Sequence, residues 1–270
     1  NLYVIEANPR ASRTVPFVSK ATGVQMAKAA VLIGLGKSIA ELKAEGYLPS
    51  NMDGASLPEE TAIAVKAAVL PFARFRTPEG VVVDSLLSPE MRSTGEVMGL
   101  DKHYDTAFAK AQAGAGSPLP TSGKVFISVA NHDKRNVIIY AKMLESLGFE
   151  IVSTGGTAEI LRRNGLNSVI VASKFAEANG DHSIVDMVRN GDIDLILNTP
   201  AGGAARSDGY EIRAAAVSVG CPVMTTISEF AAAVQAINAL REHSWDIMSL
   251  QEHGVQLAAA VDARSEGGEA

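Results

Sequence analysis

Residues 124–153, KVFISVANHDKRNVIIYAKMLESLGFEIVS, contain a short apolar run, a helical period and a second short apolar run. The run VFISV at 125–129 predicts a buried strand, residues 134–147 predict a helix, and EIVS at 150–153 predicts the next strand. This order of elements is typical of a β-α unit in a parallel sheet.

The same layout continues to the end of the second half of the chain. Further strands are predicted at 150–153, 167–172, 195–199 and 222–226, with helices beginning near Thr157, Ser183, Asp208 and Ser228. Strands that alternate with helices across short turns indicate a parallel sheet covered by helices on both faces. The predicted fold class is therefore α/β, with a doubly wound, five-stranded parallel sheet in the second half.

A stretch of small residues, glycines and prolines separates this sheet from the first half of the chain. Residues 113–123, AGAGSPLPTSG, are interpreted as a linker because such residues neither form a helix nor fill a core. We therefore expect a first domain over 1–112 and a sheet domain over 124–261. The polar, glycine-rich end, 262–270, is expected to be a disordered tail.

The first half does not have the pattern of a complete domain. We expect strands at 2–6 and 61–72, helices around 16–35, 38–45 and 104–113, and a loop near 49–58. A strand at the very start of the chain has no earlier strand to pair with. We therefore expect the first half to be the closing portion of a larger fold.

Composition limits the classes of function. The chain has 270 residues, 47% of them hydrophobic, and a net charge of −6. A globular chain of this acidity attracts nucleic acid or an anionic membrane only where basic residues cluster. The single cysteine, Cys221, excludes an intrachain disulfide and a cysteine-based zinc cluster. The apolar run near 29–35 is too short to cross a bilayer. We expect a cytoplasmic protein that binds neither membrane nor nucleic acid.

Two polar residues in the first predicted strand are candidate metal ligands. Glu6 and Asn8 are two positions apart, so their side chains face the same side of a strand. A carboxylate and an amide oxygen suit Mg²⁺ that bridges nucleotide phosphates, and Arg10, Arg13 and Lys20 follow to neutralise phosphate charge. The alternative is a solvated strand edge that binds no metal.

A second group of polar residues lies where the predicted strands of the sheet end. Ligands of doubly wound sheets bind at the carboxyl ends of the strands, beside helix N-termini. Two glycines there let the backbone approach an anion, and hydroxyls and lysines surround them. The candidate phosphate-binding residues are Ser128, Lys134, Thr154, Gly155, Gly156, Thr157, Lys174, Asn198 and Thr199. The alternative is a tight turn with lysines that are only solvated.

The first half resembles a known family. The string IEANPRASRTVPFVSKATGVQMAKAA at 5–30, with SPEMRSTGEVMGL at 88–100, closely resembles the end of the second ATP-grasp unit of the carbamoyl-phosphate synthase large chain. The resemblance implies that Glu6 and Asn8 are Mg²⁺ or Mn²⁺ ligands of the carbamate-phosphorylating site. It also implies that Arg13 is catalytic and contacts the phosphorylated intermediate or product.

This family implies an activity for a longer parent chain. The parent is expected to be a ligase that makes carbamoyl phosphate from bicarbonate, glutamine-derived ammonia and ATP, for arginine and pyrimidine biosynthesis. A glutaminase small subunit is the implied partner, and we expect the chains to oligomerise. Because the adenine pocket lies upstream in that family, the 270 residues alone are expected to be inactive with ATP.

The second half is similar to the methylglyoxal-synthase-like domain that ends the same large chain. The similar segments, within 121–240, are SGKVFISV, DKR, GFEIVSTGGTAEILRRNG and DIDLILNTP. In bacterial members this domain is allosteric, so the resemblance implies a nucleotide effector such as UMP or IMP. The positions that match nucleotide contacts are Ser128, Lys134, Thr154, Thr157, Lys174 and Asn198, with Asp208 and Ile212 near the base and ribose.

Four other positions depart from the family pattern. Pro200 and Gly209 replace residues that usually bear a hydroxyl group. Ala67 and Val223 stand where relatives that bind ornithine have a glutamate and a tyrosine, although Thr225 is kept. An amino group that is desolvated without a carboxylate partner is costly, so we expect weak or absent ornithine regulation.

Two other functions stay open. A free-standing methylglyoxal synthase shares the second fold and eliminates phosphate with an aspartate, for which Asp181 is the candidate. Alternatively, Asp181 only caps the helix that begins near Ser183. The family's histidine is replaced by Ser207, which argues against this lyase. The chain by itself can also be read as a binding and assembly module without chemistry.

Overall fold

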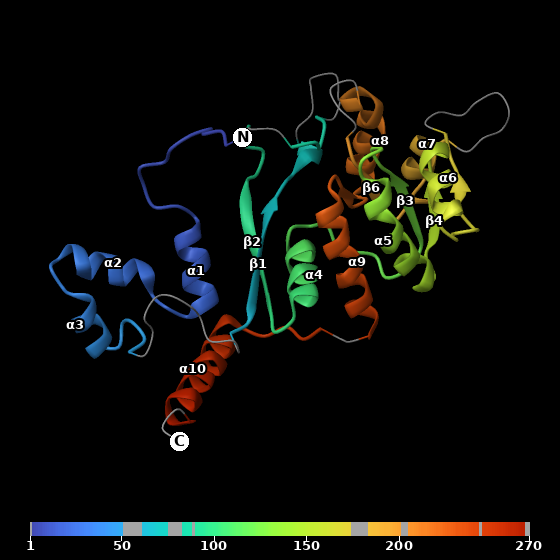
Figure 1. Ribbon diagram of the computed structural model, residues 1–270. Coiled ribbons are helices and arrows are strands. Elements are labelled where there is room, and N and C mark those ends of the chain that lie inside the picture. The colour runs from blue at the N-terminus through green and yellow to red at the C-terminus, as the bar shows by residue number, and fades with distance from the viewer. Residues whose placement is uncertain are drawn as a thin grey trace.

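The second half of the chain forms the predicted parallel sheet, as the computed structural model shows (Figure 1). The structure describes residues 2–50, 61–74, 83–87, 90–173, 183–200, 205–242 and 245–267, excluding the side chains of 73, 205–208, 258 and 260–267. The strands are β3 (Lys124–Ser128), β4 (Glu150–Ser153), β5 (Ile170–Val171), β6 (Leu195–Asn198) and β7 (Val223–Met224). Their order is β5-β4-β3-β6-β7 and every pairing is parallel, which confirms the predicted fold class.

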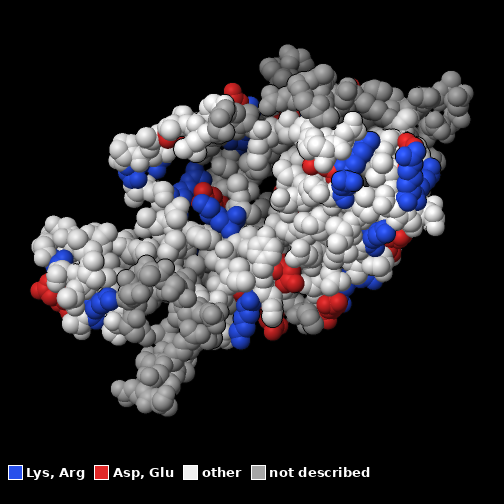
Figure 2. Space-filling model, viewed as in Figure 1, with Lys and Arg blue, Asp and Glu red and all other residues white. Residues whose placement is uncertain are grey.

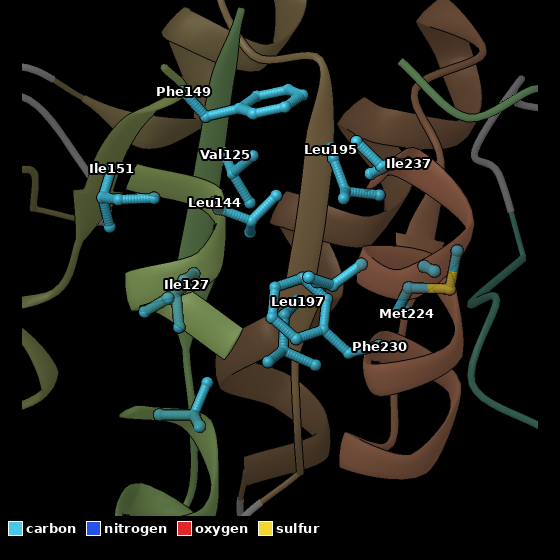
Figure 3. Close-up of a cluster of buried hydrophobic side chains, with 14 of the residues drawn as sticks. Val125, Ile127, Leu144, Phe149, Ile151, Leu195, Leu197, Met224, Phe230 and Ile237 are labelled. Carbon is cyan, nitrogen blue, oxygen red and sulfur yellow. The ribbon is translucent and has the colours of Figure 1, made fainter. Parts of the chain in front are cut away.

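A helix follows each strand, as the alternating pattern predicts. These helices are α5 (Lys134–Ser146), α6 (Gly155–Arg163), α7 (Ile184–Arg189), α8 (Ala205–Val219) and α9 (Ile227–Glu242). The strands are apolar on both sides because helices cover both faces of the sheet. Val125 and Ile127 of β3 pack toward α5 and α9 (Figure 3), whereas Phe126 packs toward α7 and α8.

The first half contributes an antiparallel ribbon to the fold. It consists of β1 (Ile63–Val69) and β2 (Gly95–Asp101), and β2 is a strand that the sequence analysis did not predict. Helix α4 (Tyr104–Gly114) lies between this ribbon and α9 (Figure 1). A side chain at Gly99 of β2 would collide with the carbonyl oxygen of Ala107, so this close approach requires glycine.

The two halves share one hydrophobic core. Phe108 and Ala109 of α4 are buried in the same cluster as Phe230 and Ile237 of α9. Leu119 belongs to this cluster as well, within the stretch that was predicted to be a linker. The prediction that residues 113–123 fill no core was therefore wrong, because α4 extends to Gly114 and Leu119 is buried in the core.

The N-terminal helices are α1 (Thr14–Thr22), α2 (Met26–Gly34) and α3 (Ile39–Ala44). The predicted helical span 16–35 is divided because Gly23, with φ 71°, ends α1 in a left-handed conformation. A short 3-10 helix, η1 (Phe72–Arg74), follows β1. The predicted loop at 49–58 falls mostly outside the described residues.

Residues 2–9 form neither helix nor strand, so the strand predicted at 2–6 was wrong. An extended segment becomes a strand only when a neighbouring strand supplies hydrogen bonds, and no described pairing involves this segment. Its apolar side chains, Leu2 to Ile5, are exposed.

The end of the described chain is helical. Helix α10 (Leu250–Gly267) continues into the predicted disordered tail at 262–270, through residue 267. Ser249 accepts a hydrogen bond from the backbone N–H of Glu252, whose carboxylate accepts one from the N–H of Ser249. This capping box and the alanines of α10 favour a continuous helix. No helix among the described residues combines the length and the apolar character that a membrane span requires.

Candidate functional site

Three neighbouring strands bring the predicted phosphate-binding residues to one edge of the sheet. In the register of the sheet, Ser128 at the end of β3 lies beside Asn198 at the end of β6. Ser153 at the end of β4 lies beside Ile127. Because the chain leaves β3 toward β4 and later returns on the other side as β6, the following loops diverge at this point. Such a switch point is where doubly wound sheets bind ligands.

We call Ser128, Lys134, Thr154, Gly155 and Gly156 the nucleotide rim, after the ligand that the sequence analysis predicts for them. The hydroxyl oxygens of Ser128 and Thr154 are 3.2 Å apart. The Lys134 ammonium lies over the glycine turn, since a Cβ built on Gly156 would be 3.4 Å from Nζ. The structure thus brings two hydroxyls, one ammonium and the glycine turn together.

The N-terminus of α6 opens onto this rim. Thr154 is the N-cap residue of α6, but its side chain makes no capping hydrogen bond within the helix. Its hydroxyl is instead directed toward Ser128. The backbone N–H groups and dipole of a helix N-terminus attract anions, so the rim combines this partial charge with the charge of Lys134.

Three further predicted residues lie below the rim. Thr157 is 2% exposed, and Asn198 and Thr199 are each 7% exposed. The Thr199 hydroxyl accepts a hydrogen bond of 2.9 Å from the N–H of Ala130, and Thr157 accepts a longer one of 3.4 Å from the N–H of Val129. These hydroxyls therefore hold the loop that follows β3. Their contact with a nucleotide stays a prediction.

The remaining predicted residues are not at the rim or are not described. Ile212 of α8 is buried in the core with Phe126 and Val152, so its side chain packs under the sheet. Lys174 and Asp181 lie outside the described residues, and so does the side chain of Asp208. The structure therefore describes most of the residues predicted to bind phosphate, but fewer of those predicted to lie near the base and ribose.

One residue that the sequence analysis missed is central to this region. Arg213 of α8 is completely buried. Its Nη1 donates a hydrogen bond of 2.9 Å to Oδ1 of Asn198. Its Nε and Nη2 donate to the two carboxylate oxygens of Asp84, at 2.7 and 2.6 Å. The signal for this residue was an arginine inside the apolar string IRAAAV, but the partner 129 positions away could not be identified from it.

The predicted metal ligands of the first half lie side by side. The amide nitrogen of Asn8 donates a hydrogen bond of 2.9 Å to the Glu6 carboxylate, and both residues are exposed. Two oxygen groups are too few to hold Mg²⁺ or Mn²⁺ alone. Among the residues that the structure describes, no three His, Cys, Asp or Glu side chains form a metal-binding group. The described residues therefore do not form a complete metal site.

Arg13 lies at a different surface feature, a cavity of about 380 Å³ between α1 and β2. Lys20 and Glu96 also line this cavity. Figure 2 shows basic and acidic side chains around a hollow between the N-terminal segment and the β1–β2 ribbon. This arrangement can accept an anion beside Arg13 and Lys20.

A larger cavity of about 620 Å³ separates the ribbon from β7 and α9. Ala67, Val223 and Thr225, the three positions considered for ornithine, all line it. Glu229 lines it too and supplies a carboxyl group that the sequence analysis did not consider. Burial raises the pKa of Glu229, which disfavours its ionised form. In the same wall, burial and the charge of Asp194 raise the pKa of the Cys221 thiol to about 12, so this cysteine is not a nucleophile.

Comparison with known proteins agrees with both resemblances. The MGS-like domain family matches residues 136–225, and the carbamoyl-phosphate synthase L chain ATP-binding domain matches residues 1–42. The chain is 70% identical over 254 residues to the carbamoyl phosphate synthase large chain of Kocuria rhizophila, with 93% of this chain and 23% of that protein covered. The large chains of Paenarthrobacter aurescens and Micrococcus luteus are each 64% identical, over 97% and 96% of this chain and 24% of each relative.

The chain thus spans about a quarter of the length of these relatives. The matching domains fall where the structure has the parallel sheet and the N-terminal helices. Over the region that it covers, the chain belongs to the carbamoyl phosphate synthase large-chain family, and its second half contains an MGS-like domain.

Proposed function

We propose that the nucleotide rim is an allosteric site that binds the phosphate group of a nucleotide such as UMP or IMP. The observation that carries the proposal is the Lys134 ammonium placed over the Gly155–Gly156 turn, beside the paired hydroxyls of Ser128 and Thr154. A phosphate at the N-terminus of α6 would accept hydrogen bonds from the hydroxyls and the backbone, and its charge would be balanced by Lys134.

We further propose that the chain is the C-terminal portion of a complete synthase. The parent would make carbamoyl phosphate from bicarbonate, glutamine-derived ammonia and ATP, in the cytoplasm and with a glutaminase small subunit, for arginine and pyrimidine biosynthesis. Glu6 and Asn8 would supply two of the ligands for Mg²⁺ or Mn²⁺ there, and Arg13 would contact the phosphorylated species. We expect the 270 residues alone not to turn over ATP, and an assay with bicarbonate, ammonia and ATP tests this.

The decisive experiment substitutes Lys134 in the full-length enzyme and measures UMP and IMP binding by isothermal titration. Lys134→Ala removes a charge-assisted contact of about 1.5–3 kcal/mol, so the nucleotide should bind roughly 10- to 100-fold more weakly. Lys142→Ala, an exposed lysine on the same helix, is the matched control and should leave the Kd unchanged. Equal affinity of the Lys134→Ala and Lys142→Ala variants would refute the site.

A phosphate-eliminating lyase remains the second candidate because the MGS-like match covers most of the sheet domain. Incubation with dihydroxyacetone phosphate tests it directly. Methylglyoxal formation that disappears in Asp181→Asn would favour the lyase, and no formation would favour the regulatory site.

A further inference from the structure

We propose that Arg213 is a positioning residue that couples the nucleotide rim to the first half of the chain through Asp84. The inference rests on the proposed nucleotide site and adds the path by which occupancy of that site reaches the remainder of the protein. Arg213 itself touches no ligand in this scheme. It acts through Asn198 on one side and through Asp84 on the other.

The charge of Arg213 ties it to Asp84. A guanidinium stays protonated in proteins, and a completely buried one needs a counter-charge. Asp84 supplies it through two hydrogen bonds in the paired geometry that arginine and carboxylate favour. The Asp84 side chain is only 27% exposed. Moving Asp84 away would break both of these bonds to a buried charge, so Arg213 and the 83–87 segment are expected to move together.

The bond from Arg213 to Asn198 fixes the orientation of the Asn198 amide. Arginine offers only donors, so the amide group of Asn198 must present its oxygen to Nη1. An amide held this way offers its NH2 group to a ligand at the end of β6. Asn198 lies beside Ser128 of the rim in the register of the sheet. A displacement of Arg213 would therefore change the orientation of the Asn198 amide at the end of β6.

Gly209 makes room for this contact. It lies one helical turn before Arg213 in α8, and a Cβ there would collide with Nη1 of Arg213 and Oδ1 of Asn198. This is the position at which the family pattern leads one to expect a hydroxyl-bearing residue. In this chain the glycine leaves the space that the close contact between Arg213 and Asn198 requires.

The other end of the network leads toward the cavity that contains Arg13. Asp84 lies between β1 and β2 in the chain, and Gly95 and Glu96 of β2 line that cavity. Helix α8 also contacts η1, directly after β1. A shift of Arg213 can thus reach both strands of the ribbon without passing through the 113–123 connection.

The test measures the coupling between two ligands in the full-length enzyme with its small subunit. The quantity is the ratio of the UMP dissociation constants with and without saturating ATP, which for allosteric pairs is typically about 5- to 150-fold. In Asp84→Asn we expect this ratio to fall to about twofold or less, while the Kd for UMP without ATP changes by less than about threefold. If Asp84 only stabilised the fold, the ratio and the Kd for UMP without ATP would change together.

Two further variants keep the result interpretable. Asp101→Asn breaks the half-buried pair with Lys110, at 2.7 Å, within the first half and should leave the ratio at the wild-type value. Gly209→Ala displaces Arg213 from Asn198 without removing a charge, and its ratio should also fall. If Asp84→Asn does not fold, Gly209→Ala decides the question.

The outcomes separate the two proposals. If the wild-type enzyme binds neither UMP nor IMP, the proposed nucleotide site is wrong. If it binds them and the ratio persists in the folded variants of Asp84 and Gly209, only the coupling role of Arg213 is overturned. A loss of UMP binding in Asp84→Asn without ATP would likewise overturn the coupling role, because Asp84 would then only support the pocket.

Discussion

The nucleotide rim and the Glu6–Asn8 pair differ in how far their surroundings support them. The rim lies at the ends of three buried strands, and Asn198 below it is held by a completely buried arginine. Glu6 and Asn8 are bonded to each other on an exposed segment without regular structure. The sequence motif is equally clear in both regions. Of the two, however, only the rim is held in place by buried strands and a buried side chain.

The largest expected effect comes from removing the counter-charge of Arg213. Asp84→Ala removes two charge-assisted hydrogen bonds from a completely buried guanidinium, which should cost about 3–5 kcal/mol. Loss of protection of the α8 amides against hydrogen exchange measures it. Glu159→Ala, which breaks an exposed pair with Arg163, should cost at most about 1 kcal/mol. Similar costs for the two would mean that the Asp84 pair is no more important than a surface pair.

An intermediate effect is expected where α4 meets the ribbon. Gly99→Ala places a methyl group against the carbonyl oxygen of Ala107, and such overpacking should cost about 1–3 kcal/mol. Gly95→Ala in the same strand meets nothing within 4 Å and is the matched control. Thermal unfolding of both variants gives the comparison, and equal midpoints would show that α4 does not lie this close to β2.

A smaller effect is expected from pH at the Asp101–Lys110 pair. Burial alone would raise the pKa of Asp101, but hydrogen bonds from Lys110 and from backbone N–H groups hold it below its ordinary value. The ionised form therefore stabilises the fold above the unfolded pKa, and this stability is lost as the pH falls through the lower folded pKa. The protection factors of the α4 amides, which are corrected for the pH dependence of intrinsic exchange, should fall below about pH 4. In Asp101→Asn this part of the pH dependence should be absent, and its persistence would contradict the assignment.

The smallest effect is expected at the exposed pair. Asn8→Ala should change the unfolding free energy by no more than about 0.5 kcal/mol, because its hydrogen bond to Glu6 is solvated. Thermal unfolding measures it. A cost that approaches that of Asp84→Ala would show that residues 2–9 are packed, and the contrast between the two regions would disappear.

The sheet domain was predictable because its signals are local. Buried parallel strands are continuous apolar runs, as in LILN of β6, and the ends of these strands lie where the sequence analysis expected them. Strand β2 was missed because GEVMGLD contains two glycines. The strand at 2–6 was predicted from its own residues, although a strand depends on a neighbour.

The support of the rim was not predictable for a different reason. Arg213 and Asp84 are 129 positions apart, and no periodicity connects an arginine in a helix to an aspartate outside any helix or strand. Nor does Gly209 reveal in the sequence that it makes room for the arginine. Contacts of this kind depend on how the two halves pack.

The central claim is that a nucleotide phosphate binds at the N-terminus of α6. Crystals of the protein grown with saturating UMP test it most directly. We predict phosphate density within hydrogen-bond distance of the Ser128 and Thr154 hydroxyls and the Lys134 ammonium. Density for UMP elsewhere, with this rim empty, would contradict the account.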